Sequence, residues 1–214
     1  TYHRYSRQLN IMHQRTLSDF YVEDIYVLDT ETTGLKGAPK DVIVDIAVCK
    51  VNLQEGTVDP VYSSVVGQDT SKWDDYKRNA WIFNNTDMTL EMVDSAPPFE
   101  QVRSEVSDLL CNKSVTSYNT GYDMKMFLYQ KPWDFKGLFR LRTDVMEAAM
   151  YVCKLPSQFY GIEYRYPKLE YAYMEITKGD PANIKGVQDH RALSDAVVAS
   201  HLMIQMYRDG TYSP

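Results

Sequence analysis

The first third of the chain contains short, dense runs of apolar and β-branched residues, a pattern that favours buried strands over amphipathic helices. The clearest runs are IYVL at residues 25–28 and IVDIAV at residues 43–48. With a weaker run that follows them, they predict three antiparallel strands at about residues 23–30, 42–52 and 60–66.

The remaining two thirds of the chain alternate between strand-like and helical patterns. A helix is predicted near residues 97–110, followed by a strand–helix–strand–helix succession over residues 115–153 and by a long closing helix at residues 192–207. The apolar stripe of the closing helix is formed by Leu193, Ala196, Val197, Ser200 and Ile204. The chain is therefore expected to fold as an α/β domain.

Two segments are less regular. Between residues 154 and 188, the spacing from Leu169 to Ile176 fits a helix on the core, whereas the aromatic residues from Tyr160 to Tyr166 suit either a surface loop or a loop that stacks on bases. Residues 1–22 are interpreted as an extension, either a basic arm or a plain terminus, that precedes a single domain over residues 23–210.

Composition favours a soluble domain over a membrane protein or a disulfide-rich protein. The 214 residues carry a net charge of -6 and include no apolar stretch that approaches the roughly 20 residues of a membrane span. No basic start is followed by an apolar segment, as a secretory leader would require. The three cysteines lie far apart, which favours free thiols and a cytoplasmic location over a disulfide framework or a zinc site.

Two carboxylates at the end of the first predicted strand are the first indication of chemistry. Asp29 and Glu31 directly follow the apolar run, and residues two apart in a strand point to the same face. Neighbouring ionised carboxylates repel each other, and a bound cation relieves that repulsion. The pair favours a metal site, although a solvated strand end explains the same pattern when the pair is considered alone.

Three further polar residues lie at the starts of predicted helices. Asp123 falls in the first turn of the helix that follows Gly121, where an acid also interacts favourably with the helix dipole. Asp195 belongs to the closing helix, and His190 lies five residues earlier, on the loop that enters this helix. Each residue alone has an ordinary structural explanation, so their meaning depends on the combination.

Together, the segments DTE at residues 29–31, NTGYD at 119–123 and HRALSD at 190–195 resemble the three exonuclease motifs of the DEDDh family. That family includes the proofreading subunits of bacterial polymerases, oligoribonuclease and RNase T. The resemblance covers about residues 23–205 in the expected order and extends to the second strand at 43–48. It implies an RNase H-like fold, with a central mixed five-stranded sheet flanked by helices.

The resemblance also implies a two-metal nuclease. By motif position, Asp29, Glu31 and Asp195 would hold one Mg²⁺ or Mn²⁺ ion, and Asp29 would bridge to a second ion that Asp123 holds through water. His190 would act as general base on the attacking water, because imidazole exchanges its proton near neutral pH. Arg191 occupies the position of the tyrosine that a sister class uses, and its permanent charge excludes it as a base.

The resemblance also implies substrate contacts, made by residues within and just after the first motif and by one residue of the second motif. They are Thr30, Thr32, Thr33, Gly34, Leu35 and Asn119. Leu35 takes the place of an apolar wedge against the terminal base, and Gly34 would let the chain approach the nucleotide closely. Tyr118 stands where many relatives have histidine, and it is either a group that affects substrate orientation or a core aromatic.

The expected function is a 3′-5′ exonuclease that releases nucleoside 5′-monophosphates from a single-stranded or frayed 3′ end, with DNA favoured and RNA as the alternative. The charge of -6 does not contradict a nucleic-acid substrate, because two divalent ions would offset most of it. The alternative function is a proofreading-type subunit or a nucleic-acid-binding module within a polymerase or repair complex. No membrane partner is expected, and a homodimer is left open.

Overall fold

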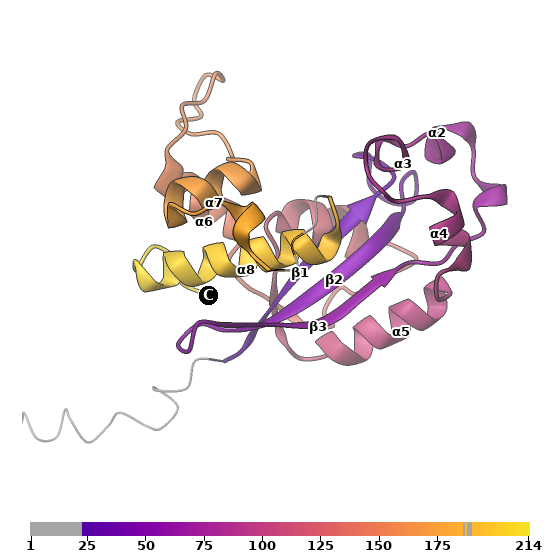
Figure 1. Cartoon of the computed structure of the whole chain (residues 1–214), viewed down its shortest axis with the longest axis horizontal. Coiled ribbons are helices and arrows are strands. Elements are labelled where there is room, and N and C mark those ends of the chain that lie inside the picture. The colour runs from indigo at the N-terminus through magenta and orange to yellow at the C-terminus, as the bar shows by residue number, and fades with distance from the viewer. Residues whose placement is uncertain (1–22, 186, 188–189) are drawn as a thin grey trace, which may run out of the picture.

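The computed structural model describes residues 23–185, 187 and 190–214, and its centre is a mixed five-stranded sheet (Figure 1). The spatial order of the strands is β3-β2-β1-β4-β5. β1 pairs antiparallel with β2 and β2 with β3, whereas β1, β4 and β5 run parallel. The strands are β1 (Ile25–Thr32), β2 (Ile43–Asn52), β3 (Thr57–Val65), β4 (Ser114–Thr116) and β5 (Arg140–Leu141). The predicted mixed sheet of five strands is confirmed, while the predicted extension over residues 1–22 lies outside the described residues.

The long helices form a layer on each side of this sheet (Figure 1). One layer contains α5 (Phe99–Leu110) and the π-helix η3 (Gly121–Leu128). The other contains α6 (Val145–Cys153), α7 (Leu169–Thr177) and α8 (Ala192–Arg208). None of the described helices is long and apolar enough to cross a membrane.

β1 is buried on both faces, and alternate residues meet different helical layers. Ile25 and Val27 pack in the cluster that includes residues of α6, α7 and α8. Leu28 packs in the cluster that includes residues of α5 and η3. Because side chains alternate along a strand, Asp29 and Glu31 continue the row of Ile25 and Val27 toward α8.

The predicted elements are present, but β1 and β3 differ from their predicted bounds. β1 continues to Thr32, so Glu31 lies inside the strand. β3 begins at Thr57 and includes Pro60 at a register shift opposite Val48 and Cys49. A proline lacks the N–H that a central strand needs, but an edge strand with a bulge tolerates it.

Three short helices between β3 and α5 were not predicted. They are too short to show an amphipathic period, and local caps start two of them. Asp74 accepts a hydrogen bond from the Lys77 amide, and Thr89 accepts one from the Met92 amide. The helices are α2 (Asp75–Arg78), α3 (Trp81–Asn85) and α4 (Leu90–Ser95), with short 3-10 turns at η2 (Thr70–Lys72) and, further along the chain, η4 (Pro181–Asn183).

The helix predicted after Gly121 is present in a widened form. η3 is a π-helix, and the hydrogen bond from the Tyr129 amide to the Met124 carbonyl, at 2.7 Å, spans five residues. Such turns are rare and are frequently found at functional sites. Asp123 lies in the first turn of this element.

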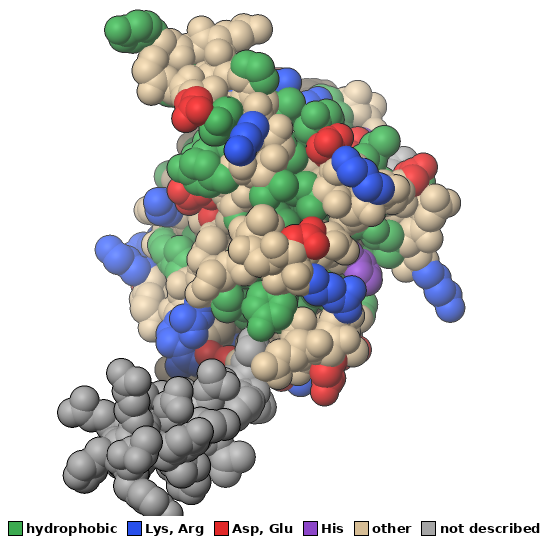
Figure 2. All heavy atoms as spheres, turned by 90° about the vertical axis from the view of Figure 1, so that its left-hand side faces the viewer, with side chains coloured by type: hydrophobic (Ala, Val, Ile, Leu, Met, Phe, Trp, Pro, Cys, Tyr) green, Lys and Arg blue, Asp and Glu red, His purple; other side chains and the backbone are tan. Residues whose placement is uncertain are grey.

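The segment from residue 154 to α7 divides as the sequence suggested. Leu169, Tyr173 and Ile176 pack against the core, so the predicted helix is confirmed. The loop before α7 projects from the body of the molecule, with hydrophobic side chains at its tip (Figure 2). Phe159 and Tyr160 are among the most exposed large side chains of the described residues. A contact between this loop and a substrate stays a prediction.

Asp144 joins the start of α6 to the turn that leads into η3. Its Oδ1 accepts hydrogen bonds from the amides of Met146 and Glu147, and its Oδ2 accepts from the Thr120 amide and hydroxyl at 2.7 and 2.8 Å. One carboxylate thus caps a helix and fixes the turn before Asp123.

Asp144→Ala should lower the free energy of unfolding by about 2–3 kcal/mol, because it removes a helix cap together with charge-assisted hydrogen bonds in a half-buried position. Urea denaturation measures the change. The matched control is Asp74→Ala, which removes the exposed cap of α2 and should cost about 1 kcal/mol. Equal losses in the two variants would contradict the junction role of Asp144.

Candidate active site

Three carboxylates meet where the end of β1 approaches the first turn of α8. Asp29 and Glu31 come from β1, and Asp195 comes from α8. One oxygen atom of each residue lies within 4.8 Å of the others. The structure therefore brings together the three residues that were predicted to hold one ion.

Burial and mutual repulsion disfavour the charged forms of these acids. Burial, followed by the charges of Asp123 and Asp195, raises the pKa of Asp29 well above its ordinary value. Burial and the charge of Asp195 raise the pKa of Glu31 to about 8, although the nearby guanidinium of Arg191 lowers it. A divalent cation relieves such crowding, and carboxylate oxygens are the ligands that Mg²⁺ and Mn²⁺ prefer. The donor set thus fits the predicted kind of ion.

Asp123 approaches Asp29 from η3. It is buried, and its Oδ1 accepts a hydrogen bond from Thr30 at 2.6 Å. Burial raises the pKa of Asp123 to about 7, while the Thr30 hydrogen bond lowers it. Among the described residues, the group within 4.8 Å is formed without Asp123, so its part at a second ion stays a prediction. Thr30, predicted to contact the substrate, is buried and orients Asp123.

His190 lies on the turn that enters α8, as predicted, with a positive φ of 56°. Its ring meets the ring of Trp81 edge-on, with 5.3 Å between the centroids. Trp81 is 58% exposed, which is unusual for so large an aromatic side chain. His190 and Asp195 also line a cavity of about 400 Å³ between α7 and the start of α8. Sequence reasoning missed Trp81, because nothing in the pattern shows that α3 reaches the entrance of α8.

A partly buried ion pair, also missed from the sequence, lies beside the carboxylates. Asp45 of β2 is opposite Glu31 in the strand register, so it faces α8 as well. Oδ2 of Asp45 accepts hydrogen bonds from Arg191 Nε at 2.8 Å and from the Ala192 amide at 3.3 Å. The available signal was an acid inside an otherwise apolar strand, since a buried charge needs a partner.

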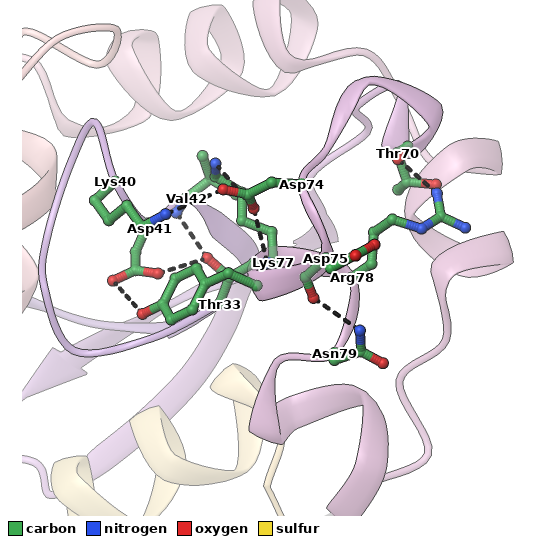
Figure 3. A network of polar contacts seen from close by, with 11 residues as sticks. Thr33, Lys40, Asp41, Val42, Thr70, Asp74, Asp75, Lys77, Arg78 and Asn79 are labelled. Atoms are coloured by element: carbon green, nitrogen blue, oxygen red, sulfur yellow. Dashed lines mark hydrogen bonds and ion pairs between the residues drawn. The ribbon is translucent and has the colours of Figure 1, made fainter.

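The turn after β1 is held by Asp41, another buried acid. Asp41 accepts a hydrogen bond from the Thr33 hydroxyl (Figure 3). It also accepts one from the Lys36 amide, and the Tyr76 hydroxyl lies 3.4 Å away. A Cβ at Gly34 would lie 2.7 Å from Asp41 Oδ1 and 2.6 Å from the Tyr76 oxygen. Packing thus explains the glycine. A close approach of substrate at this point stays a prediction, as does contact with Thr33.

The open side of this turn carries Leu35, which is 80% exposed, as a wedge against a terminal base would have to be. Behind it, Thr32 Oγ1 lies 2.5 Å from the Tyr122 oxygen, and Tyr122 donates a hydrogen bond to the Gly34 carbonyl at 2.8 Å. Tyr122 belongs to η3. It therefore connects the first and second motifs directly. Substrate contacts of Thr32 and Leu35 stay predictions.

Two side chains that precede Asp123, those of Asn119 and Tyr118, make hydrogen bonds within the protein. Asn119 Oδ1 accepts a hydrogen bond from the Tyr122 amide at 3.1 Å, so this side chain caps η3, and its substrate contact stays a prediction. Tyr118 is buried and donates a hydrogen bond to the Pro167 carbonyl at 2.9 Å. Of the two interpretations of Tyr118, the core aromatic is confirmed.

A sequence model of RNase T-type exonucleases matches residues 26–203, a range that contains the carboxylates, Asp123 and His190. The chain belongs to this exonuclease family. The resemblance to DEDDh exonucleases is thereby confirmed, and with it the assignment of the chain as a hydrolase with an RNase H-like fold. A comparison with curated protein sequences found no significant match.

Solved exonuclease structures share the fold of this family member. A 3′-exonuclease described by its recognition of the histone mRNA stem-loop has a TM-score of 0.63 at 19% identity, over 97% of this chain and 71% of the other. The nuclease domain of 3′hExo, a DEDDh family member bound to rAMP, has a TM-score of 0.58 at 20% identity, over 89% and 94% of the two chains. E. coli exonuclease I in complex with a dA16 oligonucleotide has a TM-score of 0.60 at 13% identity, over 87% of this chain but 41% of the other. At these identities the similarity shows the fold.

The raised pKa values predict how stability changes with pH. Glu31 and Asp123 have ordinary values of 4.5 and 3.8 but values of about 8 and about 7 in the fold. The folded protein therefore binds these protons more tightly, and the stability that they contribute is lost as pH rises through the folded values. In the presence of a chelator, thermal unfolding should shift to lower temperature between about pH 5 and pH 8.

Excess Mn²⁺ should reduce this loss, most strongly at high pH, because a metal binds the deprotonated acids. Differential scanning calorimetry with chelator and with Mn²⁺ measures both effects. In Glu31→Gln, which carries no titrating group at this position, the metal-free protein should show a smaller decrease with pH. The same pH dependence in wild type and Glu31→Gln would contradict the raised pKa of Glu31.

Proposed function

We propose that this chain is a metal-dependent 3′-5′ exonuclease that removes the terminal nucleotide from a single-stranded or frayed nucleic-acid end and releases a nucleoside 5′-monophosphate. The observation that carries the proposal is the group of Asp29, Glu31 and Asp195 oxygens within 4.8 Å, with His190 on the adjoining turn. Family membership supports the reaction class. The kind of end and the products are our proposal.

The carboxylates would hold two Mg²⁺ or Mn²⁺ ions. Such ions, when bound, would stabilise negative charge on the attacking and leaving oxygens. The protein's part is to keep the oxygen donors in place. β1 positions Asp29 and Glu31, and α8 positions Asp195. The hydrogen bond from Thr30 orients Asp123, which we assign to the second ion.

His190 would accept a proton from the attacking water. As this proton leaves, the water oxygen forms a bond to phosphorus, and the bond from phosphorus to the 3′ oxygen of the preceding nucleotide breaks. His190 is exposed on a turn rather than packed in the core, so a ring nitrogen is accessible to solvent and substrate. The edge contact with Trp81 limits the orientation of the imidazole.

Two exposed apolar side chains suit a single-stranded end. Leu35 lies on the turn after β1, and Trp81 lies beside His190. An aromatic ring such as that of Trp81 can stack on any base, and a base inside a duplex is already stacked and paired. We assign Leu35 to the terminal base and the backbone of Thr32 and Thr33 to the terminal sugar.

A cytoplasmic location belongs to the same proposal. Its support is that Cys49, Cys111 and Cys153 are free thiols, as expected in a reducing compartment. A place in a polymerase or repair complex, or in a homodimer, would be compatible with the fold, but no contact or surface among the described residues favours either.

Replacement of His190 and of Asp195 should give different defects. His190→Ala should lower kcat by about 10²- to 10⁴-fold, the usual contribution of a general base, while Mn²⁺ affinity is retained. Asp195→Asn should abolish turnover and weaken Mn²⁺ binding, because a ligand is lost. Steady-state kinetics on a labelled oligonucleotide and isothermal calorimetry with Mn²⁺ provide the two measurements.

The matched control is His201→Ala, since His201 lies on α8, as Asp195 does, and lines a separate cavity with Val58 and Tyr173. This variant should keep the wild-type rate. If His190→Ala weakens Mn²⁺ binding as much as Asp195→Asn does, His190 is a ligand and the assignment of the base is wrong.

Digestion should start from a free 3′ end. A linear single-stranded oligonucleotide should yield mononucleotides, whereas a closed circle of the same sequence should resist, because it has no terminal sugar to bind. Matched DNA and RNA oligonucleotides in the same assay identify the preferred sugar. Leu35→Ala should raise KM several-fold, since the variant would lose the proposed apolar contact with the terminal base, which is worth on the order of 1–2 kcal/mol. Equal cleavage of the circle and the linear strand would show an endonuclease.

A further inference from the structure

The ion pair between Asp45 and Arg191 is built into the edge of the carboxylate group. The Asp45 side chain is 1% exposed and the Arg191 side chain 21%. Asp45 Oδ2 accepts a hydrogen bond from the Ala192 amide at 3.3 Å in addition to the one from Arg191 Nε. Within the described part of the chain, the other Asp45 oxygen, Oδ1, has no hydrogen-bond donor.

The pair joins the two elements that supply the metal ligands. Asp45 is the register partner of Glu31, so its position is fixed relative to β1 by the sheet. Arg191 is the N-cap residue of α8, and its side chain makes no capping hydrogen bond to the helix. Asp45 supplies the missing acceptor from the neighbouring strand, and an acid at this end also interacts favourably with the helix dipole. The start of α8, with His190 before it and Asp195 as its fourth residue, is thus tied to the strand beside Glu31.

The pair also determines where a permanent positive charge lies. Arg191 is close enough to Glu31 for its charge to favour the ionised carboxylate, whereas the charge of Asp45 disfavours it. A guanidinium binds carboxylates readily and would compete with a metal ion for Glu31 if it were released. The hydrogen bond from Arg191 to Asp45 holds the guanidinium at β2.

We propose that Asp45 is a positioning residue of the active site, which holds the first turn of α8 in place and keeps the Arg191 guanidinium away from the metal-binding carboxylate of Glu31. The proposal deepens the proposed function and rests on it. A contribution to stability alone would not explain the pair, because buried ion pairs are on average no more stabilising than apolar side chains of the same size. Asp45 is not a catalytic residue in this scheme, since it acts through Arg191 and the helix.

The two partners should affect metal binding in opposite ways. Asp45→Asn releases the guanidinium beside Glu31, so Mn²⁺ affinity should decrease about 10- to 100-fold, the usual effect of losing an outer-shell partner. Arg191→Gln removes the competing cation and leaves Asp45 charged, so Mn²⁺ affinity should be retained or increased. Both variants should lower kcat, because both untie the start of α8. A merely structural pair would move both affinities in the same direction.

Isothermal calorimetry of the full chain with Mn²⁺ alone measures the affinities without reference to turnover. The double variant Asp45→Asn with Arg191→Gln should recover most of the affinity that Asp45→Asn loses, while its kcat stays low. The control is Asp24→Asn, which breaks the ion pair between Asp24 and Lys50. Asp24 lies just before β1 and Lys50 lies on β2, at the opposite end of these strands from the site, and loss of the pair should leave affinity and kcat unchanged.

Three results would overturn the proposal. They are unchanged Mn²⁺ affinity in Asp45→Asn, an equal loss of affinity in Asp45→Asn and Arg191→Gln, and a double variant that binds Mn²⁺ as weakly as Asp45→Asn. Circular dichroism shows whether each variant is folded, and Arg191→Gln, at the more exposed partner, tests the pair if Asp45→Asn does not fold. Failure of the wild-type chain to bind Mn²⁺ would refute the proposed function itself, whereas wild-type binding with an unaffected Asp45→Asn refutes only the role of Asp45.

Discussion

The repulsion among carboxylates at the end of β1 is the constraint on which the site depends. Asp29, Glu31 and Asp195 hold oxygens within 4.8 Å although burial and like charge raise the pKa of both β1 acids. Hydrophobic packing holds them there, since Ile25 and Val27 in the same row of β1 are buried in the core beneath α8. The fold thus stores an unfavourable charge arrangement that a divalent cation relieves.

A single strand organises both sides of this site through the alternation of its side chains. Asp29 and Glu31 face α8, whereas Thr30 faces the other way and donates its hydrogen bond to Asp123 on η3. The register of β1 against β2 then places Asp45 beside Glu31. A shift by one residue would exchange the two faces, so the buried apolar residues of β1 specify the geometry of the carboxylates as well as the stability of the sheet.

The parts that could be predicted from the sequence are those with a short-range pattern. Alternation placed Asp29 and Glu31 on one face, and the regular stripe of the closing helix placed Asp195 in its first turn and His190 before it. The bounds of β2 and α8 agreed closely for the same reason. The helices between β3 and α5 were missed because four to six residues are too few to show a period.

The parts that could not be predicted are contacts between residues far apart in the sequence. Asp45 and Arg191 are separated by 146 positions, and neither residue carries a local signal of the other. Trp81 likewise meets His190 only because α3 lies against the entrance of α8. These contacts surround the predicted residues rather than replace them. The motif therefore identifies the groups that react, while the contacts around it determine which charges face the metal-binding carboxylates and how the histidine is oriented.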